Sequence, residues 1–124
     1  MHFAHLHAHS YFSLGLGTAS PEALARAAAE RGMQAAALTD THSLGGAARF
    51  MRACREAGIR PALGLTLTVG DARGHWQEGG GGRLTLLART EAGWRNLIRL
   101  LNASWRGRRR GEGPQAAFAD LATC

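Results

Sequence analysis

The chain has 124 residues, of which 45% are hydrophobic, and its formal net charge is +6. These values are typical of one globular domain with a core of its own. No apolar run is long enough for a signal peptide or a membrane span, so we expect a cytoplasmic protein that does not contact a membrane. The two cysteines, Cys54 and Cys124, show no metal-binding or disulfide-framework spacing, and we expect reduced thiols.

Strand and helix signals alternate along the chain. The clearest helix start is Ser20-Pro21-Glu22, which combines an N-cap, a proline at the first helical position and an acidic first turn. Gly32 and Gly58 are natural ends for the first two helices. The expected strands cover residues 2–8, 35–39, 61–69 and 83–88. The expected helices cover residues 21–31, 44–57, 91–103 and 115–122.

This alternation predicts an α/β fold built from a parallel sheet or a barrel of βα units. Four such strands form an open half of a barrel. The segment 70–82 is rich in glycine and is expected to be a hairpin or a disordered loop. The segment 105–114 is basic and is expected to be a linker. The whole range 1–124 is treated as one domain.

Three histidines, His5, His7 and His9, alternate near the start of the chain. Alternate residues of an extended strand share one face, so we expect the three imidazoles to project to the same side. Imidazole is a common metal ligand, and two or three on one face form half of a metal site. The alternative is a histidine stripe on the surface. A purification tag is disfavoured because the run is interrupted and passes directly into patterned sequence.

A second polar cluster follows the second expected strand. In α/β folds, chemistry gathers at the carboxyl ends of the strands. The first strand ends at His7 and His9, and the second is followed by Asp40 and His42. Imidazoles and a carboxylate, with positions left open for water, form a hydrolytic metal site. We therefore predict His7, His9, Asp40 and His42 as metal ligands. The alternative is a turn in which Asp40 caps the next helix.

The same residues resemble the amino-terminal part of a PHP domain, the polymerase and histidinol phosphatase superfamily. The likeness is strongest to the PHP domain of the alpha subunit of bacterial replicative DNA polymerases and their error-prone relatives. It extends over about the first hundred residues. The segments that carry it are His5–Leu14, Ala37–Asp40, Ala57–Gly64, Leu84–Ala88 and Gly93–Leu97.

The resemblance implies a distorted barrel of seven βα units, of which this chain would supply about the first four. It also implies a cluster of up to three divalent metals, Zn²⁺ or Mn²⁺, at the carboxyl ends of the strands. The family's ligands correspond to His7, His9 and Asp40 in this sequence. His5 is then expected to be a neighbour of the site and not a ligand.

Three departures from the family pattern predict a degenerate site. The family's second motif reads Thr-Asp-His, whereas Thr41 occupies the place of that histidine and His42 comes one residue later. Thr66 replaces a glutamate of the third motif. The sequence ends at Cys124, before the later strands of the family would follow. We therefore expect a fragment or an oligomer whose open edge is covered by the rest of a longer subunit or by a second copy.

An arginine-rich tract follows the third expected helix. Arg106, Arg108, Arg109 and Arg110 lie beside Trp105. Such a tract can bind phosphates of DNA while the indole stacks on a base. A solvated linker is the alternative.

Three functions are compatible with these features. The first is a PHP domain of a DNA polymerase III alpha-type subunit, accessory to replication or repair synthesis, with weakened exonuclease chemistry. The second is a free-standing metal-dependent phosphoesterase acting on a small phosphate ester. The third is a nucleic-acid-binding module without catalysis. We favour the first, because Thr66 and the absent later strands both disfavour the second.

Overall fold

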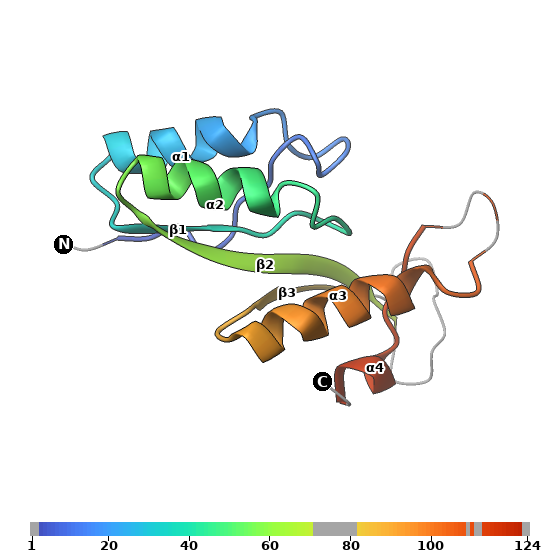
Figure 1. Ribbon diagram of the computed structural model, residues 1–124. Coiled ribbons are helices and arrows are strands. Elements are labelled where there is room, and N and C mark those ends of the chain that lie inside the picture. The colour runs from blue at the N-terminus through green and yellow to red at the C-terminus, as the bar shows by residue number, and fades with distance from the viewer. Residues whose placement is uncertain (1–2, 71–81, 109, 111–112, 123–124) are drawn as a thin grey trace.

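The computed structural model describes residues 3–70, 82–108, 110 and 113–122. It is a mixed α/β structure with four helices and a three-stranded sheet in this part of the chain (Figure 1). The elements in chain order are α1 (Pro21–Glu30), β1 (Ala35–Leu38), α2 (Ala47–Glu56), β2 (Arg60–Val69), β3 (Gly82–Leu87), α3 (Glu91–Trp105) and α4 (Phe118–Ala122).

The first helix forms where its start signal predicts. The Ser20 hydroxyl accepts a hydrogen bond from the backbone N–H of Ala23 at 3.1 Å, and Pro21 occupies the first helical position. Gly32, with a φ of +72°, ends the helix region as expected. α3 has the same kind of start, because the Thr90 side chain accepts from the N–H of Gly93. Local capping chemistry therefore determines where both helices begin.

Two helices are shorter than the sequence predicts. α2 begins at Ala47, three residues after Leu44, and its N-cap Gly46 makes no side-chain cap. α4 begins only at Phe118, because the residues before it extend the sheet. The N–H of Ala116 donates to Thr68 O at 2.9 Å, and Ala116 forms an isolated parallel bridge with Val69.

The sheet has the order β1-β2-β3. β1 and β2 are parallel, with Ala35 opposite Arg60 and Leu38 opposite Leu63. β2 and β3 are antiparallel, with Gly64 opposite Leu87. The prediction of an all-parallel sheet is therefore wrong for the last strand. The sequence between β2 and β3 is rich in glycine and does not favour the crossover helix that a parallel partner needs, whereas an antiparallel partner can follow a hairpin connection. Most of the predicted loop 70–82 lies outside the described residues.

The expected first strand is an extended segment with a single isolated bridge, between His5 and Ala36. Its carbonyls at His5 and Ala8 accept from Ala37 N at 2.8 Å and Thr39 N at 2.9 Å. The step of two residues from Ala37 to Thr39 thus matches a step of three residues from His5 to Ala8, which is the count of a β-bulge. The extra residue breaks the alternation, so the expected common direction of all three imidazoles does not hold.

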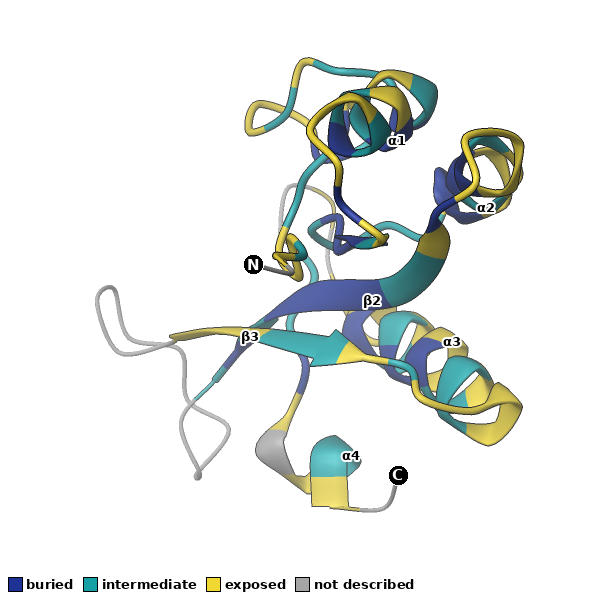
Figure 2. Cartoon of the chain, turned by 90° about the vertical axis from the view of Figure 1, so that its left-hand side faces the viewer, coloured by how far each residue is buried: buried dark blue, intermediate teal, exposed yellow. Residues whose placement is uncertain are grey.

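The core consists of two apolar clusters on the two halves of the sheet. α1 and α2 lie side by side over β1, and their cluster is centred on Ala25, Phe50 and Cys54, which are fully buried (Figures 1 and 2). α3 packs along β2, where Leu65 and Leu67 are fully buried. Cys54 is a core residue, as predicted, and burial raises the pKa of its thiol to about 11.

Among the helices of the described residues, none combines the length and apolar character needed to cross a bilayer.

Candidate functional site

The two predicted motifs lie next to each other because the N-terminal segment runs beside β1. The N–H of Thr39 donates to Ala8 O at 2.9 Å, and the N–H of Ala8 is 3.1 Å from the Thr39 hydroxyl. This pairing places His7 and His9, on either side of Ala8, close to the turn that follows β1. The carboxyl end of the strand therefore carries the predicted groups, as its position in an α/β fold indicates.

His7 and His9 face each other. Their Nε2 atoms are 3.0 Å apart, and the rings meet edge to face with centroids 4.8 Å apart. Two nitrogen ligands on one tetrahedral Zn²⁺ ion, at bonds of about 2.0–2.1 Å, are separated by about 3.3 Å. The observed separation is therefore close to the one that a shared metal ion requires.

Asp40 is buried and its carboxylate holds the loop that carries His9. Oδ1 accepts hydrogen bonds from the Ser10 N–H at 2.6 Å and from the Ser13 hydroxyl at 2.7 Å. Oδ2 accepts from the Ser10 hydroxyl at 2.7 Å. Charge-assisted bonds of this kind are short and strong. Asp40 does not cap α2, whose N-cap is Gly46. The carboxylate instead joins the turn after β1 to the N-terminal segment.

Ser13 connects this carboxylate to the His9 ring. Its hydroxyl donates to Asp40, accepts from the Thr41 N–H at 2.9 Å, and lies 3.3 Å from His9 Nδ1. A serine hydroxyl has one donor and two acceptor positions, so the remaining acceptor position takes a proton from Nδ1. The network thus assigns the Nδ1–H tautomer to His9 and leaves the lone pair of its Nε2 directed at His7.

The surroundings favour an uncharged His9. Partial burial lowers the pKa of His9 below its usual value, and the nearby His7 and Arg83 lower it further, against an opposing effect of Asp40. A neutral imidazole with a free lone pair is the form that binds a metal. The donor Nδ1–H bonded to a second residue is also the usual arrangement behind a metal-binding histidine.

The donor set fits a metal only in part. His7 and His9 present two nitrogens at a suitable separation, and Asp40 supports them from behind through Ser13. Within the described ranges, no three His, Cys, Asp or Glu side chains come together as a metal-binding group. The geometry therefore provides a candidate half-site, in which His7 and His9 are backed by Ser13 and Asp40.

His42 is held away from this pair by a different contact. Its Nε2 is 2.9 Å from the Thr68 hydroxyl on β2, and its backbone has a φ of +53°. Burial lowers the pKa of His42, and Arg83 adds to the effect. Its Nδ1 and the neighbouring Thr41 hydroxyl are buried atoms without a hydrogen-bond partner.

Thr66, at the position of the family's glutamate, is part of the sheet. Its hydroxyl donates to Thr39 O at 2.9 Å and lies 3.0 Å from the Thr85 hydroxyl. Its side chain is buried. This position supplies a hydroxyl that links three strands instead of a carboxylate for a metal.

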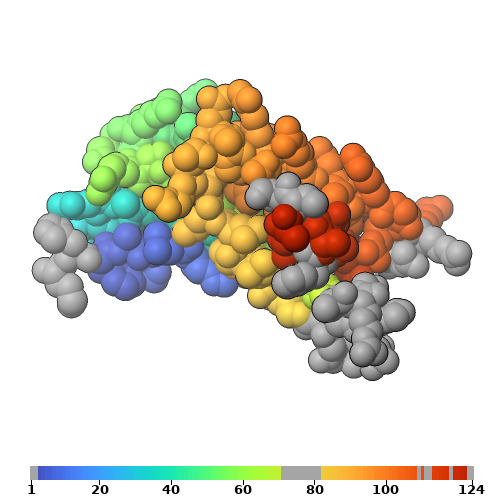
Figure 3. Space-filling view, turned by 90° about the horizontal axis from the view of Figure 1, so that it is seen from below, coloured from blue at the N-terminus to red at the C-terminus, as the bar shows by residue number. Residues whose placement is uncertain are grey.

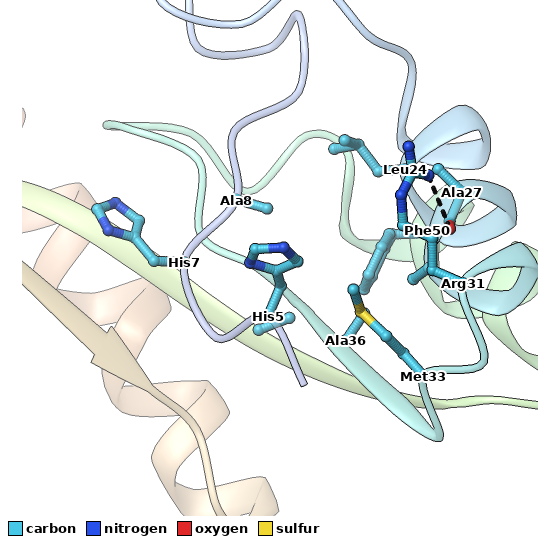
Figure 4. Close-up of a pocket in the computed structure, with 11 residues that line it drawn as sticks. His5, His7, Ala8, Leu24, Ala27, Arg31, Met33, Ala36 and Phe50 are labelled. Carbon is cyan, nitrogen blue, oxygen red and sulfur yellow. Dashed lines mark hydrogen bonds between the residues drawn. The ribbon is translucent and has the colours of Figure 1, made fainter. Parts of the chain in front are cut away.

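His5 lies beside a cavity of about 360 Å³ between the N-terminal segment, α1 and β1. The ring of His5 stands over its lining near Met33 and Phe50, while the His7 ring is turned away from it (Figure 4). The Arg31 guanidinium at the rim donates to Ala27 O at 3.1 Å. His5 and His7 therefore point in different directions, and that His5 neighbours the site without being a ligand stays a prediction.

The arginine tract begins where α3 ends. Trp105 is the last helical residue and its side chain is 52% exposed. Arg106, Arg108 and Arg110 are exposed, and Arg108 is 3.5 Å from Gln115 O. Arg109 lies outside the described residues. The predicted linker therefore offers at least three solvated cations beside an exposed indole.

Sequence reasoning did not single out Ser10 and Ser13, although they support the half-site. The sequence signal that could have indicated them is their position: Ser10 follows His9 directly, and Ser13 comes three residues later in the turn after the histidines. Serine is favoured in turns because its hydroxyl bonds to nearby groups. The acceptor of both hydroxyls is Asp40, which follows α1 in the sequence and comes close to the two serines only in the folded chain.

Comparison with known proteins agrees with these motifs. The family described as "PHP domain" matches residues 5–121. The chain belongs to the PHP domain family. The resemblance seen in the sequence is thereby confirmed, and the match covers both the histidine motif and the turn after β1.

Similar proteins are much longer than this PHP chain. It is 43% identical over 119 residues to an error-prone DNA polymerase of Symbiobacterium thermophilum, covering 96% of the chain and 10% of the relative. It is 36% identical over 111 residues to DNA polymerase III subunit alpha of Pseudomonas aeruginosa, covering 89% of the chain and 9% of the relative. The chain therefore spans about a tenth of the length of these relatives.

A solved structure supports the partial PHP-like fold. The chain superposes on an amidohydrolase from Chromobacterium violaceum, solved with bound sulfate and no metal, with a TM-score of 0.65 and 28% identity. The match covers 85% of this chain and 34% of the amidohydrolase.

Proposed function

We propose that this PHP domain is an accessory module of a bacterial DNA polymerase III alpha-type subunit, active in the cytoplasm in replication or repair synthesis. Its identity to polymerase relatives, over 96% of the chain in one case, supports this assignment. Its partners would be DNA and the remainder of the subunit. A free-standing phosphoesterase is less well supported, because similarity to the polymerases extends over nearly the whole chain.

The observation that carries an accessory role is the use of Asp40 and Thr66 as structural groups. Three hydrogen bonds occupy the Asp40 carboxylate, and the Thr66 hydroxyl bonds within the sheet. His7 and His9 remain as the groups that would hold a divalent metal, Zn²⁺ or Mn²⁺. When bound, such an ion supplies Lewis-acid chemistry for phosphoester hydrolysis. With so few ligands, weak metal affinity and reduced phosphoesterase activity are expected.

The remainder of a larger subunit would also cover exposed apolar side chains. β3 lies at one edge of the described sheet and exposes Leu84 and Leu87. Leu14 is 90% exposed on the loop after the histidines. Open strand edges and apolar patches favour association with further protein, either the rest of the subunit or a second copy.

Metal content tests the half-site. The purified chain, the double variant His7→Ala, His9→Ala and the control His5→Ala would be equilibrated with Zn²⁺ or Mn²⁺ and measured by elemental analysis. In excess metal we expect the wild-type and control chains to bind up to about one ion each and the double variant to lose it, because His7 and His9 face each other in the described part of the chain. Equal metal content in all three proteins, or none in the wild type, would contradict the half-site.

The surface at the end of α3 supports nucleic-acid binding as a second candidate function. Exposed Trp105 lies beside the exposed Arg106, Arg108 and Arg110 at the end of α3. This combination suits a single strand of DNA, whose phosphates pair with arginine and whose bases stack on the indole. Such binding is compatible with an accessory role in a polymerase.

A further inference from the structure

A largely apolar cavity lies between α2, the first residues of β2 and the start of α3. Its volume is about 560 Å³, which is within the range of about 300–1,000 Å³ that small-molecule sites have. Figure 2 shows α2 above and α3 below the end at which β2 begins. In Figure 3, the first residues of α3 lie beside the green atoms of α2. The cavity is therefore formed by three elements that are distant in the sequence.

This cavity separates the two apolar clusters of the core. Leu63, on β2, packs against the first cluster, whereas Ala88 and Trp94 pack against the second. These three side chains, together with Met51 and Pro61, line the cavity and are only half-buried. Because the transfer of apolar surface out of water is favourable, an apolar body in the cavity would join the two clusters.

The cavity borders an edge of β2 on which the described residues place no strand. β3 pairs with β2 only from Gly64 onward. At the preceding position the N–H of Ala88 donates to Leu63 O at 2.8 Å, and the chain then leaves the sheet toward α3. The first residues of β2 are therefore covered by β1 on one edge, while the other edge faces the cavity.

Pro61 disfavours the addition of a further strand at this edge. The N–H of Arg60 donates to Gln34 O, on the side of β1. Successive residues of a strand direct their backbone polar groups to alternate edges, so the nitrogen of Pro61 faces the open edge, where proline has no N–H to donate. A proline in this place blocks pairing with another chain. The cavity therefore suits a compact ligand and not an added strand.

Arg89 determines the charge that such a ligand should carry. Among the described residues that line the cavity it is the one cation, and it is exposed. Glu91 at the same rim is paired with Arg95, and the Thr90 hydroxyl accepts from the N–H of Gly93. Neither ion pair of the described residues involves Arg89. The N-terminal end of α3, which favours negative charge, lies at the same rim, so the rim attracts an anionic group.

We propose that this cavity binds a small anionic ligand with an apolar body, such as an aromatic carboxylate or sulfonate. The rings of the ligand lie among Met51, Leu63 and Trp94, since a flat indole and an adaptable thioether side chain both pack well against aromatic rings. The anionic group accepts hydrogen bonds from the guanidinium of Arg89 at the rim.

The proposed ligand site goes beyond the accessory function in a polymerase and does not depend on the metal half-site. None of the predicted metal ligands lines the cavity, and the arginine tract after α3 is not part of it. Its failure would therefore leave the outcomes expected for metal content and for DNA binding unchanged.

Fluorescence titration of the full 124-residue chain with two probes, in excess chelator and at constant ionic strength, tests the charge of the ligand. The probes are anilinonaphthalene sulfonate, an aromatic anion, and its uncharged analogue phenylnaphthylamine. We expect saturable binding of both. Arg89→Gln should weaken binding of the sulfonate by about fivefold or more and that of the uncharged probe by less than about twofold, because only the anion loses a charge-assisted contact.

The control for charge is Arg26→Gln. It removes the same charge from an exposed arginine of α1 that does not line the cavity, and it should change the affinity for either probe by less than about twofold.

The variant Ala48→Phe tests the location of the site. Ala48 is exposed on α2 and lines the cavity, so a phenyl group there occupies part of the space and should weaken both probes by about fivefold or more. Ala92→Phe adds the same ring at an exposed position of α3 outside the cavity and should leave both affinities within about twofold. Circular dichroism and the unfolding midpoint verify that both variants fold.

Four outcomes would overturn the proposal. They are no saturable binding to the wild type, equal effects of Arg89→Gln and Arg26→Gln on the sulfonate, equal effects of Ala48→Phe and Ala92→Phe, and dimerisation that the probe prevents. The last outcome, measured by sedimentation with and without the probe, would assign the cavity to a second copy of the chain.

Discussion

At the scale of single residues, the chemistry of Asp40 is decided by its neighbours. A carboxylate after a strand and close to histidines has the pattern of a metal ligand. In the fold it is 1% exposed and accepts from two serines of the N-terminal segment. It therefore determines the position and tautomer of His9 through Ser13. A residue of this kind contributes to a site by support, as groups behind a metal ligand do.

The variant Asp40→Asn tests this supporting role. Asparagine keeps the shape but turns an amide NH₂ toward donors, so at least one buried hydrogen bond is lost. We expect the free energy of unfolding to fall by about 2–4 kcal/mol, measured by urea denaturation. The exposed control Glu56→Gln should change it by less than about 0.5 kcal/mol. Equal unfolding midpoints for Asp40→Asn and the wild type would show that the carboxylate does not hold the loop.

Two histidines with lowered pKa values predict a pH dependence. The pKa of His9 and that of His42 are lower in the folded chain than in the unfolded chain, mainly because of burial. The unfolded chain therefore binds protons first as the pH falls below the usual histidine value of about 6.5. We expect stability in chelator to be highest above that pH and to decrease toward pH 5. Denaturation at a series of pH values measures it.

The double variant His9→Gln, His42→Gln is the control for this pH effect. It removes both groups, so its stability should depend less on pH between 7.5 and 5. A wild-type chain that becomes more stable as the pH falls through this interval would contradict the lowered pKa values.

At the scale of elements, the pair of β2 and β3 shows how close two backbones approach. A Cβ on Gly64 would lie 2.4 Å from Leu86 O, a distance that no real contact shows. β3 pairs here as an antiparallel strand, with Gly64 opposite Leu87. The glycine thus permits the strand partner that replaces the expected parallel one.

The variant Gly64→Ala should therefore destabilise the chain. Because the nearest atom to the added methyl group is the backbone oxygen of Leu86, which cannot move aside as a side chain can, we expect a loss of about 2–3 kcal/mol in the free energy of unfolding. Gly82→Ala, in β3 with no atom within 4 Å of the added Cβ, is the matched control and should have little effect. Comparable losses in both variants would indicate that flexibility, and not close packing, matters at Gly64.

The N-terminal segment shows how one additional residue changes the direction in which neighbouring side chains point. Alternation of three histidines predicts one common side, and this holds only for a regular strand. The bulge against β1 places His5 beside an apolar cavity and leaves His7 and His9 facing each other. A single additional residue reverses the direction of side chains in an extended chain.

At the scale of the whole molecule, the net charge is +6, and the arginines that carry the positive charge have different surroundings. Arg49 pairs with Glu22 and Arg95 with Glu91, both on the surface. The exposed arginines after α3 have Trp105 beside them, whereas other exposed arginines, among them Arg26, Arg52 and Arg55, lie on α1 and α2. Charge alone attracts DNA anywhere on such a surface, but stacking localises it.

A charge-matched pair of triple variants tests the arginine tract. Replacing Arg106, Arg108 and Arg110 by Gln should weaken binding of single-stranded DNA by at least about tenfold and lower the slope of log affinity against log salt by about 2, because each phosphate contact contributes about 0.7. The measurement is fluorescence anisotropy at several salt concentrations.

The matched triple variant replaces Arg26, Arg52 and Arg55, which are exposed on α1 and α2, by Gln. It has the same net charge and should retain most of the affinity. Equal losses in the two variants would assign the binding to overall charge and exclude a specific interface at the end of α3.

The sequence by itself determined the family, the two capped helices, the buried Cys54 and the order of most elements. These depend on local chemistry: Ser20 and Thr90 cap helices from within three residues, and short motifs mark the turns. The predictions that failed were those that depend on residues distant in the sequence. The strand direction of β3 is one, since Gly64 and Leu87 meet only in the sheet.

Only the tertiary structure decided what Asp40, His5 and His42 contact. The bulge beside β1 separates His5 from its neighbours, and Ser10 and Ser13 reach Asp40 across about thirty residues of sequence. His42 meets Thr68 and Arg83 at a cavity assembled from four segments. Spacing along a chain predicts which groups approach a strand end, but hydrogen bonds and packing between segments decide which atoms of those groups remain free.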